Sequence, residues 1–131
     1  MTKDQLIQYW IDTSENDYKT MQNLFKSGDY SWTLFIGHLV IEKLLKALYV
    51  LRVDTNPPKT HDLIRIAEKA GLTMTDEIED QLDIITTFNL NTRYPDYKLN
   101  FYKKCNQTFT ESNIRVIEEV RRWLIVLIEE R

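Results

Sequence analysis

A chain of 131 residues can bury a core without metal or disulfide staples, so we expect a single domain over residues 1–131. Its 17 Lys and Arg against 20 Asp and Glu give a formal charge of −3, which excludes a global field that would draw it to nucleic acid or anionic lipid. The single cysteine, Cys105, excludes an internal disulfide and a cysteine-based zinc site. No secretion signal and no apolar run of about twenty residues is present, so we expect a cytoplasmic protein without membrane contact.

Two long helices are predicted in the first half of the chain. Thr2 and Gln5 have the spacing of a capping box, and apolar residues then recur at helical spacing until Gly28. The second helix is expected over about Tyr30–Val53. Its apolar side chains cover most of the circumference, which indicates a buried helix contacted on several sides. The pair Pro57-Pro58 follows it and marks a loop.

Two further helices are predicted before residue 89. Thr60 is expected to cap a short helix that Gly71 ends in the left-handed position favoured after a helix. Thr75 is expected to cap the next helix, whose apolar residues recur at steps of three or four up to Phe88.

Residues 89–109 show no helical period of their own and are predicted to form a long ordered loop. Pro95 disfavours a helical conformation at Tyr94, and the many large apolar residues argue against disorder. Thr108 and Glu111 then have the spacing of a capping box at the start of a final helix. The prediction is an all-α bundle of about five helices, with a long ordered loop before the last one.

Three polar residues form a stripe on the second helix. His38, Glu42 and Lys46 are four residues apart and therefore share one face. They could form an intrahelical ion pair with a neighbouring imidazole, or they could line a cleft or subunit interface. A metal site is less favoured than either, because the stripe ends in a cation and no His-rich spacing is present.

His61 is expected in the first turn of the short helix that Thr60 begins. One interpretation is a solvated imidazole at this turn, with Asp62 at the favourable end of the helix dipole. The other is an anion site, because a helix N-terminus attracts phosphate and His61 would lie beside it.

Arg93 and Asp96 also allow two interpretations. They could form a local salt bridge that pins the loop, with Tyr94 and Tyr97 packed beneath it. Alternatively, the guanidinium could bind phosphate oxygens in bidentate fashion beside aromatic rings that stack on a base. Three lysines in the same segment, at positions 98, 103 and 104, add positive charge.

Three motifs together resemble the HEPN family of prokaryotic helical domains. They are the helix sequence FIGHLVIEKLLKAL at 35–48, the THDL sequence at 60–63 and the TRYPD sequence at 92–96. The resemblance covers nearly the whole chain. It implies an up-and-down helical bundle, a homodimer, and a toxin–antitoxin-like pairing with a minimal nucleotidyltransferase. It also implies nucleotide or RNA binding, and metal-independent RNase activity in many members.

The RNase members of this family carry an Arg followed by four to six residues and a His, and this chain departs from that pattern. The positions that would follow Arg93 at this spacing are Lys98, Leu99 and Asn100. A lysine is a poor general base unless it is strongly desolvated. His61 is the candidate base that could supply the missing imidazole from another part of the chain.

The favoured hypothesis is a dimer that binds a nucleotide or RNA phosphate and acts with a nucleotidyltransferase protein, without a cofactor or metal. In this hypothesis Arg93 contacts the phosphate and Asp96 orients Arg93. The expected site residues are Arg93, Tyr94, Asp96, His61, Lys46 and Glu42. One alternative is a metal-independent RNase toxin that uses Arg93 with His61 as the base. Another is a structural interaction module that binds no ligand.

Overall fold

The computed structural model describes all residues 1–131, and the chain is entirely helical. There are six helices, with no strand. Their bounds are α1 Lys3–Lys26, α2 Tyr30–Arg52, α3 Leu63–Lys69, α4 Asp76–Arg93, α5 Pro95–Lys104 and α6 Gln107–Glu129. The all-α prediction is confirmed, but the expected number of helices was one too low.

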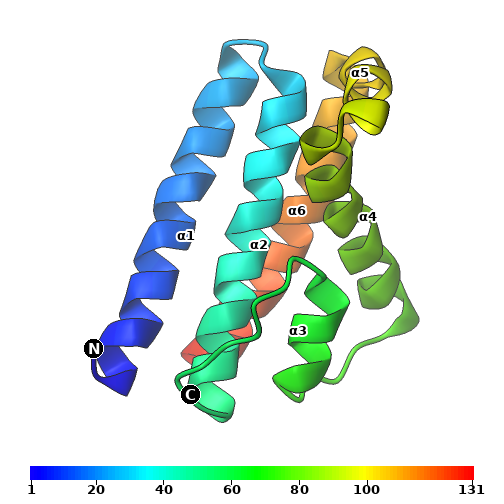
Figure 1. Cartoon of the computed structure of the whole chain (residues 1–131). Coiled ribbons are helices and arrows are strands. Elements are labelled where there is room, and N and C mark those ends of the chain that lie inside the picture. Colours follow the sequence, from blue (N-terminus) through cyan, green and yellow to red (C-terminus); the bar gives the residue numbers. More distant parts are fainter.

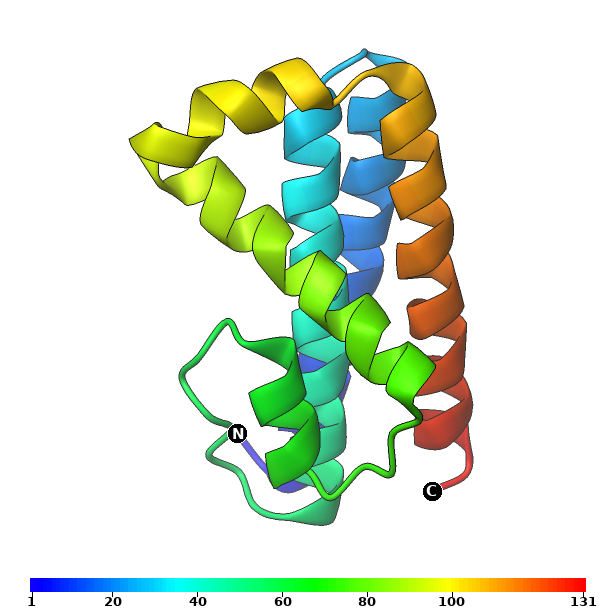
Figure 2. The same cartoon turned by 90° about the vertical axis from the view of Figure 1, so that its right-hand side faces the viewer.

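The four long helices run alternately up and down, and the short helices α3 and α5 lie between them in the chain. Figures 1 and 2 show α1, α2 and α6 nearly side by side, with α4 crossing α2 obliquely. Helix α5 lies at one end of the bundle, beside the turn that joins α1 to α2. Both chain termini and α3 lie towards the opposite end (Figure 1).

Helix α2 forms the centre of the molecule. Twelve of its 23 residues are buried, whereas α1 buries only three residues along a similar length. Every other helix packs against α2. The prediction of a helix contacted on several sides is therefore confirmed, and polar residues on α2 are held among packed neighbours.

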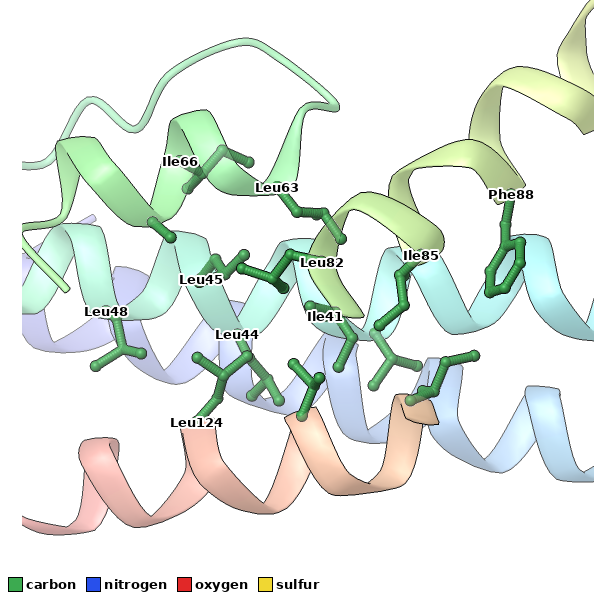
Figure 3. Close-up of a cluster of buried hydrophobic side chains, with 14 of the residues drawn as sticks. Ile41, Leu44, Leu45, Leu48, Leu63, Ile66, Leu82, Ile85, Phe88 and Leu124 are labelled. Carbon is green, nitrogen blue, oxygen red and sulfur yellow. The ribbon is translucent and has the colours of Figure 1, made fainter. Parts of the chain in front are cut away.

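The hydrophobic core joins α2 to the second half of the chain. Figure 3 shows leucine and isoleucine side chains of α2 meeting those of α3, α4 and α6. The labelled residues are Ile41, Leu44, Leu45, Leu48, Leu63, Ile66, Leu82, Ile85, Phe88 and Leu124. Each fully buried side chain of this size contributes about 1.5–3 kcal/mol relative to an exposed one, so this cluster fixes the position of α3 and α4 on α2.

Gly37 allows α2 to approach two neighbours closely. A Cβ at this position would overlap Ile117 Cδ1 of α6 and would lie 3.2 Å from Met21 Sδ of α1. A glycine inside a helix is otherwise unfavourable. Its presence here is explained by close contact with both flanking helices.

The predicted loop over residues 89–109 is wrong, because most of it is helical. Helix α4 continues to Arg93 and α5 begins at once with Pro95. Tyr94 is extended, with φ −102° and ψ 125°, so the break before Pro95 occurs as predicted. Proline is well suited to the first position of a new helix, however, and α5 starts there. The chain turns a corner instead of forming a loop.

Two of the predicted capping residues are displaced by a few positions. Asp62, not Thr60, is the N-cap of α3, and Asn106 replaces the predicted Thr108 at the start of α6. The capping box of Thr2 at α1 and the left-handed Gly71 after α3, with φ +74°, are confirmed. No helix is both long and apolar enough to cross a membrane.

Candidate functional site

Glu42 is the centre of a polar cluster on the buried face of α2. Its side chain is 7% exposed. One carboxylate oxygen accepts a hydrogen bond from Lys46 Nζ at 3.1 Å, and the other accepts one from His61 Nδ1 at 2.7 Å. The stripe expected on one face of α2 is present. It is completed by a residue from the segment that precedes α3.

His61 is held by α2 through both its main chain and its ring. It lies just before α3, not in the first turn of that helix as predicted, because Asp62 is the N-cap. His38 Nε2 donates to the His61 carbonyl oxygen at 2.9 Å, and this bond fixes the backbone close to Glu42. Leu63, the first residue of α3, is fully buried in the hydrophobic core and anchors the turn that follows His61.

The hydrogen bond to Glu42 determines which nitrogen of His61 is left without a hydrogen-bond partner. A carboxylate only accepts, so Nδ1 carries the proton and Nε2 is left without a partner in this cluster. The ring is 50% exposed. His61 therefore keeps Nε2 free as an acceptor when the ring is neutral, and as a donor when the ring is protonated.

His38 lies beneath this arrangement and is fully buried. Burial lowers its pKa from the ordinary value, even though the His61 carbonyl and the nearby Glu42 carboxylate favour the charged form. Since Nε2 donates to a carbonyl, Nδ1 is unprotonated, and it has no hydrogen-bond partner at 3.9 Å from Glu42 Oε1. His38 is thus a neutral structural link.

The Lys46 side chain is mostly enclosed by its neighbours, which leaves little of it accessible to a ligand. Its side chain is 12% exposed, and its ammonium lies 5.4 Å from the centre of the Trp10 ring as well as beside Glu42. The ammonium compensates the buried carboxylate. The chain contains no group of three or more His, Cys, Asp or Glu residues arranged to hold a metal ion.

Arg93, Tyr94 and Asp96 form a second group at the α4–α5 corner. Arg93 ends α4, Tyr94 is the break, and Asp96 lies in the first turn of α5, where its charge suits the helix dipole. All three are exposed. No ion pair joins Arg93 to Asp96, and Tyr94 and Tyr97 are each about half exposed, so the pinned loop with tyrosines beneath it is not formed.

The two groups are separated along α4. Thr86 Oγ1 of α4 accepts from the backbone N–H of Leu63, next to the His61 segment. Arg93 is seven residues further along the helix, a rise of about 10 Å. Within one chain the structure brings together Glu42, Lys46 and His61, and it does not add Arg93, Tyr94 or Asp96 to them.

Trp32 and Lys98 form a contact that the sequence did not reveal. The Lys98 ammonium of α5 lies 5.6 Å from the centre of the Trp32 ring, which is 45% exposed near the start of α2. Trp32 belongs to the apolar circumference of α2, so the sequence predicts that it is buried. No local spacing indicates a partner on α5, because the contact depends on how two distant segments pack.

Comparison with known proteins agrees with the helical architecture and motifs. A family model described as HEPN domain matches residues 7–130. The chain belongs to the HEPN family. The fold of this HEPN chain is similar to the crystal structure of TT1696 from Thermus thermophilus, with a TM-score of 0.77, 15% sequence identity, and coverage of 90% of this chain and 94% of that one. Comparison with curated proteins gives no match.

Proposed function

We propose that this HEPN protein binds the phosphate of a nucleotide or RNA at the α4–α5 corner, with Arg93 as the principal contact. The observation that supports this most is that Arg93 is exposed and has no carboxylate partner. Residues 93–104 carry four cations against one carboxylate, a local formal charge of +3 in a chain of −3. An unpaired guanidinium in such a field suits phosphate recognition.

The proposal includes a homodimer and a nucleotidyltransferase protein as the functional partner. Membership of the HEPN family supports both, because such pairs in this family form toxin–antitoxin-like systems. In a dimer, the Arg93 corner of one subunit and the His61 ring of the other could serve the same ligand. Glu42 and Lys46 would then act by holding His61 in place.

Arg93→Ala tests the phosphate contact. Loss of one charge-assisted hydrogen-bonding group should weaken binding of a short RNA by about 1–3 kcal/mol and leave the melting temperature unchanged. Isothermal calorimetry gives the affinity, and circular dichroism gives the melting curve. Arg52→Ala is the matched control, because Arg52 is also exposed and unpaired but lies at the end of α2. Equal affinity of the Arg93→Ala and intact proteins would refute the proposal.

A metal-independent RNase is the second candidate, and the Glu42–His61 pair favours it. A carboxylate that fixes Nδ1–H leaves Nε2 as a positioned general base, the arrangement that proton abstraction from a ribose hydroxyl needs. The Arg-to-His spacing of the RNase members is absent, however. The phosphate-binding proposal therefore expects no RNA cleavage by the purified protein.

An RNA digestion assay in EDTA distinguishes the two candidates. Positioned acid–base groups contribute about 10²–10⁴-fold, so cleavage that depends on His61 would be easily measured. Cleavage by the intact protein that is lost in both His61→Ala and Glu42→Gln would establish the RNase. Cleavage that persists in both variants would identify a contaminating nuclease.

A further inference from the structure

A groove of about 460 Å³ lies between the start of α2 and helix α5. One wall is formed by residues 28–32, from the α1–α2 turn and the first turn of α2. The other includes Pro95, Lys98, Leu99 and Tyr102 of α5. Figure 1 shows α5 at the end of the bundle opposite α3. The groove adjoins the Arg93 corner, because Thr92 and Pro95 are among its lining residues.

Two aromatic rings of the groove are unusually open to solvent. Trp32 is 45% exposed and Tyr102 is 68% exposed. Lys98 Nζ lies 5.6 Å from the centre of the Trp32 ring, close enough for a cation–π interaction that positions its charge at the groove. Flat exposed rings beside a cation are the elements with which proteins bind single-stranded nucleic acids without reading their sequence.

The charged residues at the groove indicate what kind of ligand it would bind. The lining of the groove has one cation, Lys98, and one carboxylate, Asp29, and the neighbouring Arg93 and Lys103 add positive charge beside it, so an anionic ligand is favoured over a basic peptide. A two-fold contact between copies through this groove would bring two identical positive surfaces together. The one carboxylate of the groove, Asp29, already accepts a hydrogen bond from the Ser27 hydroxyl at 2.7 Å.

A second and larger cavity, of about 580 Å³, lies between α4, α5 and α6, and its lining likewise has one carboxylate and one cation. It includes Asp83 among its lining residues, and its one cation, Lys104, lies 5.2 Å from the centre of the Phe109 ring. The groove beside Trp32 differs in having two exposed rings, Trp32 and Tyr102, whereas the larger cavity has one, Tyr97.

We propose that the groove beside Trp32 binds a base of single-stranded RNA, stacked on Trp32 and Tyr102, while the adjoining phosphates follow Lys98 towards Arg93. The volume falls within the range of about 300–1,000 Å³ that is typical of small-ligand sites. This inference rests on the proposed phosphate site and adds to it a site for the uncharged base of the ligand. It makes the site selective for nucleotides over other phosphates.

The test compares an oligoadenylate hexamer with an abasic hexamer of the same length, each measured by calorimetry. The two ligands carry the same phosphates and differ only in the bases. The intact protein should bind the hexamer about tenfold or more tightly than the abasic strand, as expected from stacking. Trp32→Leu and Tyr102→Leu should reduce this ratio towards one without weakening the abasic strand. The tryptophan fluorescence should be quenched by the hexamer only, and Trp32→Leu should remove this quenching.

Controls separate the failure of this inference from failure of the phosphate site. Tyr9→Leu changes a tyrosine of α1 that is 44% exposed and should leave both affinities unchanged. If Arg93→Ala weakens both ligands but Trp32→Leu and Tyr102→Leu change neither, the stacking groove is refuted and the phosphate site stands. If neither ligand binds the intact protein, both proposals fall. If Trp32→Leu instead converts a dimer to a monomer in light scattering, the groove is a subunit interface and the inference is wrong.

Discussion

His38 shows how burial determines the chemistry of a single residue in this protein. It lies beneath Glu42 and His61 and links α2 to the segment before α3. Protonation would place a charge in the core, and the approach of Glu42 only partly offsets that cost, so its pKa is lowered. The same residue fixes the backbone of His61 and so supports the exposed ring indirectly.

We expect the stability of the protein to fall as the pH is lowered through the ordinary histidine range. Because the folded pKa of His38 is depressed, the unfolded chain binds its proton first, starting near pH 6.5, where an ordinary histidine titrates. The contribution of His38 to the free energy of unfolding is therefore complete above that pH. It is lost as the pH falls towards the pKa of His38 in the folded state. Urea unfolding at pH 7.5 and pH 5.0 measures it, and His38→Gln should reduce the pH dependence. An identical pH dependence in both proteins would contradict this assignment, since the two differ only at residue 38.

The candidate site could be predicted from the sequence only as far as local spacing reaches. The pairing of Glu42 with Lys46 follows from their separation of four residues on one helix. The pairing of Glu42 with His61, and the distance between this cluster and Arg93, depend on how α3 and α4 pack on α2. No spacing along the chain contains that information.

At the scale of the helices, the periodic elements were predictable and α5 was not. Phe101 and Cys105 are buried one turn apart, as an amphipathic helix requires. Tyr97, Leu99 and Tyr102 are large and apolar yet exposed, so the apolar stripe of α5 cannot be recognised from the pattern. The exposed aromatic residues that obscure the helical pattern of α5 in the sequence are the same residues that form its solvent-facing surface.

Gly37→Ala should destabilise the contact of α2 with α6, although alanine is the better helix former. The added methyl group overlaps Ile117 Cδ1, and overpacking costs about 1–3 kcal/mol against a propensity gain of about 1 kcal/mol. Chemical denaturation should show the net loss. Ile117→Val removes the overlapping atom, so the same substitution made in that background should cost less. If the cost is equal in both backgrounds, the close approach is not its cause.

At the scale of the whole molecule, apolar side chains remain exposed after α2 has been covered. Ile84 and Tyr97 are 43% and 50% exposed and line the cavity between α4, α5 and α6. The other helices cover most of α2, the helix with the widest apolar circumference. An interface between copies is therefore expected mainly on the outer helices.

We expect the protein to be a dimer at micromolar concentration, because exposed apolar surface of this kind marks interfaces. Light scattering after size exclusion measures the mass, and Ile84→Glu should shift it towards the monomer by placing a charge in the contact. His61 and Arg93 are unaltered in this variant. A monomeric intact protein at micromolar concentration and above would refute the expectation.

The position of the two chain termini determines where a tag or tether can be attached for binding experiments. Both ends of the chain lie at the end of the bundle away from α5 (Figure 1). An affinity tag, a fluorescent protein or a tether to a sensor surface can therefore be attached at either terminus without covering the groove beside Trp32. The tethered protein would present α5 outward to the solution, which suits surface-based measurement of RNA capture.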